Sequence, residues 1–218
     1  MAQRLWRHAP IDIHACDNDA FRCACQSGHL PVAQWLWKVF GEGLGDQVGW
    51  CFMAASDGGF WDVCKWLWSV STIVDHTVVC HALSSACEIG HVEFVQWLWH
   101  AAPQACVQDA ELAFDTACDH GHLAMAKWLL KAHPALDVYA QGERPFCTTC
   151  AKVYLEFAQW LWAQRGHARW QNALVDASQH SHAHVVQWLL RVATEEGGFH
   201  PPPPPKPDIC LHRCCICP

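Results

Sequence analysis

The sequence lacks the segments that direct a chain into or across a membrane. Residues 1–10 contain no apolar core of signal-peptide length, and no run approaches the roughly 18 apolar residues that span a bilayer. The 15 cysteines would suggest a disulfide framework in a short secreted chain. Because no secretory signal is visible, we expect reduced thiols and a cytoplasmic protein.

An excess of basic charge is also missing. Charged residues make up 16% of the chain, and the formal net charge is -7 with histidine neutral. A general nucleic-acid binder needs a basic footprint that displaces counterions from phosphates, so we expect no nucleic-acid partner. Hydrophobic residues make up 52%, which excludes a chain that is disordered by composition.

Motifs that carry catalysis are absent as well. The sequence has no Gly-rich phosphate loop, no Gly-x-Ser-x-Gly elbow and no His-Glu-x-x-His pair. Cys147 and Cys150 have CxxC spacing, but no second CxxC or nearby histidine pair completes a four-ligand site. The alternating residues His180, His182 and His184 are poor ligands on a helix, where positions i and i+4 face together. We expect no enzyme, no cofactor and no metal site in this part of the chain.

Tryptophan is present in excess, and its placement reveals a repeat. Among the 14 tryptophans, six are separated by 31, 31, 31, 32 and 28 residues, and each is followed by leucine: Trp35, Trp66, Trp97, Trp128, Trp160 and Trp188. Seven positions before each of the first four lies a glycine, at Gly28, Gly59, Gly90 and Gly121. Such matching positions at a fixed period are the signature of a repeat architecture.

Each unit divides into two predicted helices. In the first copy, the apolar residues of 21–27 follow i, i+3, i+4 spacing, and Gly28 should end this helix in a left-handed conformation. A second helix is predicted over 31–39, with Pro31 in its first turn. The linkers at 11–13 and 136–138 should form short extended fingers or turns. Since one helix pair cannot bury its own apolar face, neighbouring pairs must stack into an all-α solenoid.

The units resemble the ankyrin repeat. The resemblance rests on ACQSGHLPVAQWLW at residues 24–37 and ACDHGHLAMAKWLL at 117–130, and it covers about 1–191. The Thr-Pro-Leu-His opening typical of the family is missing, since residues 19–22 read DAFR. The resemblance implies an ankyrin-type domain over 1–196 whose work is to bind another protein. The tryptophan-rich variant looks like the ankyrin arrays of giant DNA viruses that infect amoebae, which implies a host-modulating protein in the host cytoplasm.

The two ends of the chain depart from the repeat. Residues 2–6 align with 33–37, so about six units follow a half repeat, which fits either an end cap or a truncated longer array. Residues 197–218 form a proline- and cysteine-rich segment that we expect to be disordered, with a run of prolines at 201–205. Its cysteines are Cys210, Cys214, Cys215 and Cys217. They are either free thiols, metal ligands or disulfide partners, or palmitoylation sites.

The repeat positions suggest roles for single residues. The tryptophan column should form the core between repeats, so Trp97→Ala should destabilise the fold by roughly 3–5 kcal/mol. Cysteines at Cys25, Cys87, Cys118 and Cys150 share one position and should pack as small apolar residues. Histidines at His29, His91, His122 and His182 open the second helix, where a local hydrogen-bonding role is expected.

A partner site is predicted from acids that share one repeat position. Asp57, Glu88 and Asp119 occupy this position in three successive copies, and Asp115 extends the set. These acids are either solvated polar residues or a docking stripe on the concave face for a basic segment of a protein partner. We expect a monomer. Other hypotheses are the substrate-recognition part of a ubiquitin-ligase adaptor (no F-box is visible), a metal- or redox-responsive protein acting through the tail, and a decayed fragment.

Overall fold

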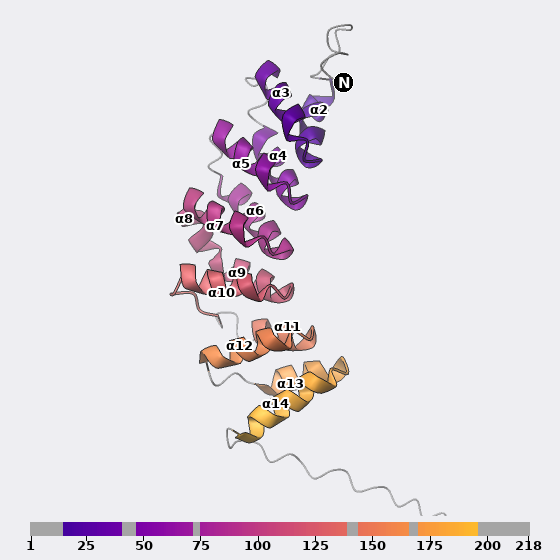
Figure 1. The fold of residues 1–218 in the computed structure, drawn as a ribbon, viewed down its shortest axis with the longest axis vertical. Helices are drawn as coiled ribbons and strands as arrows, with labels where there is room; N and C mark the ends of the chain where they lie inside the picture. The colour runs from indigo at the N-terminus through magenta and orange to yellow at the C-terminus, as the bar shows by residue number, and fades with distance from the viewer. Residues whose placement is uncertain (1–14, 41–46, 72–74, 139–143, 166–169, 196–218) are drawn as a thin grey trace, which may run out of the picture.

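A computed structural model describes residues 15–40, 47–71, 75–138, 144–165 and 170–195. In these residues every regular element is a helix, and the helices pack in series as pairs along one long axis (Figure 1). The first helices of the pairs are α2 (Ala15–Gln26), α4 (Val48–Asp57), α6 (His76–Ile89), α9 (Ala110–Asp119), α11 (Arg144–Ala151) and α13 (Trp170–Gln179). The second helices are α3 (Leu30–Phe40), α5 (Trp61–Val70), α7 (Val92–Ala101), α10 (Leu123–Ala132), α12 (Leu155–Arg165) and α14 (Ala183–Glu195).

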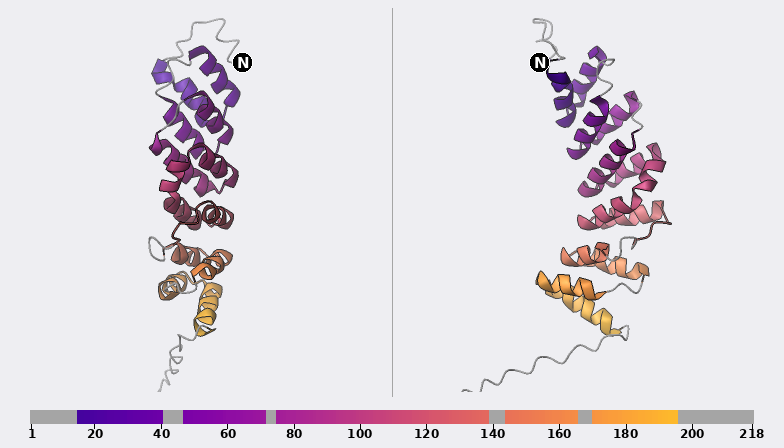
Figure 2. Two further views of the ribbon diagram at one scale, coloured as in Figure 1. Left: turned by 90° about the vertical axis from the view of Figure 1, so that its left-hand side faces the viewer. Right: turned by 180° about the vertical axis from the view of Figure 1, so that it is seen from behind.

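The first helices form a continuous row. Each packs directly on the next, from α2 on α4 through to α11 on α13, and each also packs on the second helix of its own pair. Figure 2 shows the same order from two other sides, with neighbours in sequence lying next to each other in space. The predicted all-helical serial architecture is therefore confirmed, and the helices predicted over 21–27 and 31–39 are α2 and α3, each longer than expected.

A left-handed residue closes every first helix, as predicted for Gly28, whose φ is +70°. At this turn the His29 N–H donates to the Ala24 carbonyl at 2.8 Å, and the Gly28 N–H donates to Cys25 at 3.1 Å. This pair of bonds is a Schellman motif, which satisfies carbonyls at the helix end. Val153 and Ser181 replace glycine in the last two copies and still have φ of +67° and +60°. The motif therefore holds its geometry even where the side chain disfavours it.

The interior is built from columns of small and apolar residues. The leucine that follows each repeat tryptophan is buried in every copy: Leu36, Leu67, Leu98, Leu129, Leu161 and Leu189. The four cysteines of the shared column are also fully buried. Small residues at such positions let neighbouring helices approach closely, and this explains why serine replaces cysteine there at Ser56, which is equally buried.

The tryptophans lie at the boundaries between repeats. All six residues of the predicted column are half-buried and pack against the hydrophobic core. Most of them meet, edge to face, the second tryptophan of the preceding Trp-Leu-Trp. The pairs are Trp37–Trp66 at 6.1 Å, Trp68–Trp97 at 5.8 Å, Trp99–Trp128 at 5.5 Å and Trp162–Trp188 at 6.2 Å between ring centroids. We call these pairs the tryptophan ladder. It is interrupted where Leu130 replaces tryptophan, and there Trp160 contacts Phe114 instead, at 6.5 Å.

The linkers differ from one another. Between α7 and α9, residues Pro103–Gln108 form the short helix α8, with proline in its first turn and Cys106 buried. The segment 136–138 has no regular structure, although Leu136 is buried. The predicted finger at 11–13, the half repeat near the N-terminus and the tail at 197–218 lie outside the described residues.

Candidate binding surface on the first helices

Two exposed positions recur on the first helices. One lies nine residues before the left-handed residue and is occupied by Trp50, His81, Leu112 and Arg144 in successive copies. The other lies two residues before it and holds the predicted acids Asp57, Glu88 and Asp119. Because seven residues are about two helical turns, both positions face the same side of each helix. These residues together with Asp115 are called the first-helix face below.

Large apolar side chains are exposed on this face. Trp50 is 43% exposed and Leu112 is 47% exposed. The guanidinium of Arg22, one repeat earlier, lies 4.6 Å from the centroid of the Trp50 ring, which is cation–π geometry. Sequence reasoning missed both apolar residues. The sequence did contain a sign of their exposure. Trp50 and Leu112 share a repeat position with a histidine and an arginine, and a position that accepts such different residues does not belong to the core pattern.

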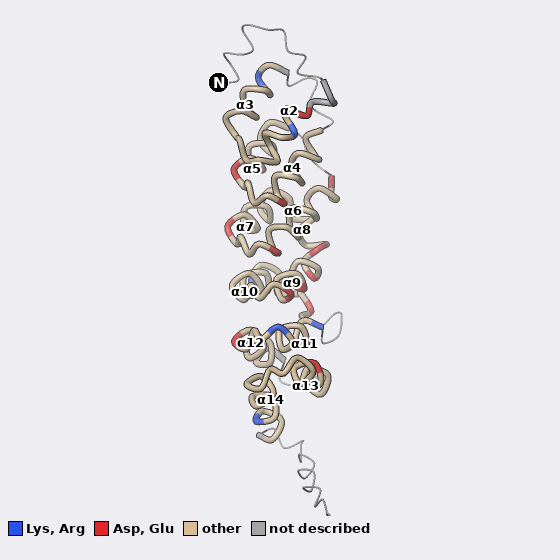
Figure 3. The backbone as a smooth tube through the Cα atoms, turned by 90° about the vertical axis from the view of Figure 1, so that its right-hand side faces the viewer, with Lys and Arg blue, Asp and Glu red and all other residues tan. Residues whose placement is uncertain are grey.

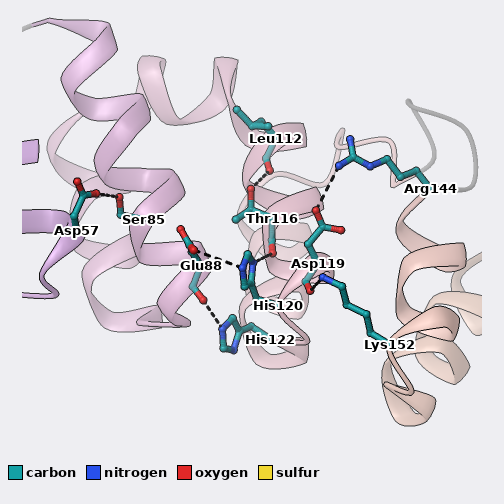
Figure 4. Close-up of polar contacts among 10 residues, drawn as sticks. All are labelled: Asp57, Ser85, Glu88, Leu112, Thr116, Asp119, His120, His122, Arg144 and Lys152. Atoms are coloured by element: carbon teal, nitrogen blue, oxygen red, sulfur yellow. Dashed lines mark hydrogen bonds and ion pairs between the residues drawn. The ribbon is translucent and has the colours of Figure 1, made fainter. Parts of the chain in front are cut away.

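The predicted acids at the helix ends contact the following repeat. Asp57 lies 2.7 Å from His81 Nε2 and accepts a hydrogen bond from the Ser85 hydroxyl at 2.7 Å. Figure 4 shows that Glu88 and Asp119, like Asp57, each contact a side chain of the following repeat. His120 Nε2 lies 3.7 Å from the Glu88 carboxylate.

Asp119 is held by the repeat that follows it. The guanidinium of Arg144 donates to Asp119 Oδ2 at 3.4 Å, and the ammonium of Lys152 donates to the Asp119 carbonyl at 2.6 Å. Figure 3 marks the acidic positions along α4, α6 and α9 and the basic ones where α11 begins and ends. A carboxylate in the last turn of a helix is disfavoured by the helix dipole, so these cross-repeat donors offset an unfavourable placement. The pairs are exposed, and each contributes little on its own.

Asp115 differs from the other three acids. It is only 8% exposed, and its Oδ2 atom is buried and has no hydrogen-bond partner. Burial raises the pKa of this carboxyl, Arg144 opposes that rise, and the charges of Asp119 and Glu111 add to it. An ionised carboxylate here is therefore short of donors.

Three of the histidines that open second helices form hydrogen bonds: His91 forms the expected local one, whereas His122 and His182 reach across repeats. His91 Nδ1 accepts the Phe94 N–H at 3.0 Å and so caps its own helix. His122 Nε2 lies 2.8 Å from the Glu88 carbonyl, and His182 Nε2 lies 2.7 Å from the Ala151 carbonyl. This repeat position therefore links the start of a second helix to the end of the first helix in the preceding repeat, at His122 and at His182.

The buried thiols of the shared cysteine column are poor nucleophiles. Burial raises the pKa of Cys87 and of Cys150 to about 12. A hydrogen bond with Cys51, together with burial, raises the pKa of Cys25. Across the described ranges, no group of three or more histidine, cysteine or acidic side chains has the arrangement that holds a metal ion. The tail cysteines lie outside those ranges.

A pocket of about 480 Å³ lies under α8, away from the first-helix face. It is lined mainly by apolar atoms, including those of Trp68 and Val79, with His76 at one side. His76 Nε2 lies 3.0 Å from Asp109 Oδ2. Burial and the Asp109 carboxylate raise the pKa of the nearby Cys80 thiol, which works against thiolate formation there.

Comparison with protein-family models and with curated proteins gave no match to this chain. Among the described helices, none combines the length and the apolar character that crossing a bilayer requires.

Proposed function

We propose that this chain is an ankyrin-type repeat protein and that it binds another protein through the first-helix face. The helix pairs packed in series, the period of about 31 residues and the left-handed turn at the Gly-His position support the ankyrin-type assignment. We further propose that the array acts as a monomer in the cytoplasm, and on host proteins if the likeness to viral arrays holds.

One observation carries the proposal. Along the first helices, the packed columns keep the same residue types from copy to copy, whereas the exposed position changes from Trp50 to His81 to Leu112 to Arg144. Stacking does not require this variation, because these side chains lie outside the core. An exposed surface whose chemistry changes along its length can distinguish one partner from another, and aromatic and arginine side chains are common anchors in protein interfaces.

The charges favour a partner segment with basic character. Asp57 and Glu88 face histidines of the following repeat, so no lysine or arginine stands opposite either carboxylate in these contacts. Long-range attraction between these carboxylates and a basic segment would speed association and select partners more than it would add affinity.

The test is affinity capture from a cell lysate with the full chain, followed by a binding measurement on each captured protein. Trp50→Ala/Leu112→Ala removes the two apolar anchors of the face. The matched control is Val32→Ala/Val39→Ala, which removes two exposed apolar residues of α3. Circular dichroism of both variants checks whether they keep the helical fold before binding is compared.

A captured protein that binds the control as well as wild type, but binds the first variant at least tenfold more weakly, supports the proposal. A second comparison uses Asp57→Ala/Glu88→Ala/Asp119→Ala, which should slow association and weaken its dependence on salt. Equal binding by all variants would place the interface elsewhere and refute the assignment to this face.

A further inference from the structure

Asp115 is the member of the first-helix face whose bonding is incomplete. Asp57 and Asp119 each have a side-chain donor from the next repeat within hydrogen-bond distance, and Glu88 has a histidine nitrogen at 3.7 Å. The Oδ2 atom of Asp115 is buried with no donor, in a residue that is 8% exposed. Buried carboxylate oxygens are normally paired, so this site is short of one donor.

The surroundings of Asp115 favour a cation as that donor. Glu111 and Asp119 contribute negative charge, and Arg144 is the cation that acts on Asp115. Arg144 also donates to Asp119, so its guanidinium is shared between two carboxylates. One guanidinium therefore serves both Asp115 and Asp119, and a second cation would balance the local negative charge more fully.

An apolar surface lies beside this carboxylate. Leu112 precedes Asp115 by three residues on α9, so the two side chains lie on the same face of the helix. Leu112 is 47% exposed. Lysine and arginine have apolar stems that cover such surfaces while their charged ends reach an acid. Rotation about the Asp115 χ2 angle is soft, so its two oxygens exchange places at little cost.

We propose that Leu112 and Asp115 anchor one lysine or arginine side chain of the partner protein, with its stem on Leu112 and its charged end on Asp115. This inference rests on the proposed function and makes it more specific. Asp57, Glu88 and Asp119 already serve contacts between repeats. Asp115 is therefore the residue that selects a basic partner, and the other acids guide its approach.

The test begins with a phage-displayed library of random linear peptides selected on the full wild-type chain. Selected peptides should share a lysine or arginine. Replacing that residue in the peptide by norleucine, or by alanine if it is arginine, should weaken binding to the wild-type chain by about 30-fold, as loss of a buried charge pair does. This arm needs no change in the protein, so it does not depend on the folding of any variant.

Protein variants then locate the contact. Asp115→Asn should weaken binding of the same peptide by about 30-fold, and Leu112→Ala by about fivefold. The matched control is Asp62→Asn, which removes an exposed acid on α5, outside the first-helix face, and should change affinity by less than about threefold.

The outcomes separate this inference from the proposed function. If Asp115→Asn weakens binding no more than Asp62→Asn, the anchor is refuted, although loss of binding in Trp50→Ala/Leu112→Ala would still support the first-helix face. If that double variant also binds every selected peptide at full strength, both proposals fail. Selection of peptides without a basic residue would refute the anchor directly.

Discussion

The contact between His122 and the turn at Gly90 gives the most closely determined prediction. Gly90 has φ of +83°, and a Cβ atom added there would lie 2.5 Å from Nδ1 of the His122 ring. Gly90→Ala therefore strains the backbone by about 1–2 kcal/mol and must displace the ring. Displacement breaks the bond from His122 Nε2 to the Glu88 carbonyl, 2.8 Å long, at a further ~0.5–1.5 kcal/mol. We expect a total destabilisation of about 2–3 kcal/mol.

The assay is urea unfolding of wild type, Gly90→Ala, His122→Ala and the double variant. His122→Ala removes the ring, so in the double variant the added methyl group meets no obstacle and only the backbone strain remains. The double variant should therefore lose about 1 kcal/mol less than the sum of the two single variants. Strict additivity, or a loss below about 1 kcal/mol for Gly90→Ala, would refute the reasoning that the ring closes this turn.

Three further predictions concern stability. Ser181→Gly should raise the free energy of unfolding by about 0.5–1 kcal/mol, because Ser181 is exposed and has φ of +60°; a lower urea midpoint would contradict this. Trp97→Ala should lower it by about 3 kcal/mol, since the half-buried ring contacts both Trp68 and Phe94, and an unchanged melting temperature would refute the proposed packing. Burial raises the pKa of Asp115, so its ionised form destabilises the fold above about pH 4, the unfolded-state value. Asp115→Asn should therefore be more stable than wild type at pH 7, and urea titrations should show the difference closing as the pH falls toward 4.

Much of the backbone was predictable because each position of the repeat occurs in several copies, and every copy indicates the same local conformation. The glycine column predicted where the first helices end, and Val153 shows that the turn keeps its φ after the glycine is lost. The packing of adjacent apolar residues was harder to predict. Trp35 and Leu36 both belong to the apolar stripe, and the periodicity does not say which one is fully enclosed. In the structure the leucine fills the interior, and the larger indole lies half-exposed at the repeat boundary.

The candidate surface was predictable in position but not in its bonding. A shared repeat position identifies residues that occupy equivalent places in successive copies, but it does not identify their contacts. Asp57, for example, contacts His81, 24 residues away, and Ser85, 28 residues away. Such pairs depend on how one helix pair is rotated on the next, which the sequence pattern does not specify. The same limit applies to Asp115, whose carboxyl is affected by Arg144 of the next repeat. α8 was missed because six residues are too few to show a helical period.

The tryptophan ladder has an optical consequence. Its four edge-to-face pairs have interplanar angles between 81° and 87°. Excitation that passes from one indole to its partner therefore moves into a ring plane nearly perpendicular to the first. Transfer between rings whose transition dipoles point in different directions lowers the polarisation of the emitted light, even from rings that hardly move. Low fluorescence anisotropy in this protein would report energy migration within its pairs, and Trp66→Phe, which breaks the pair with Trp37, should restore part of the anisotropy.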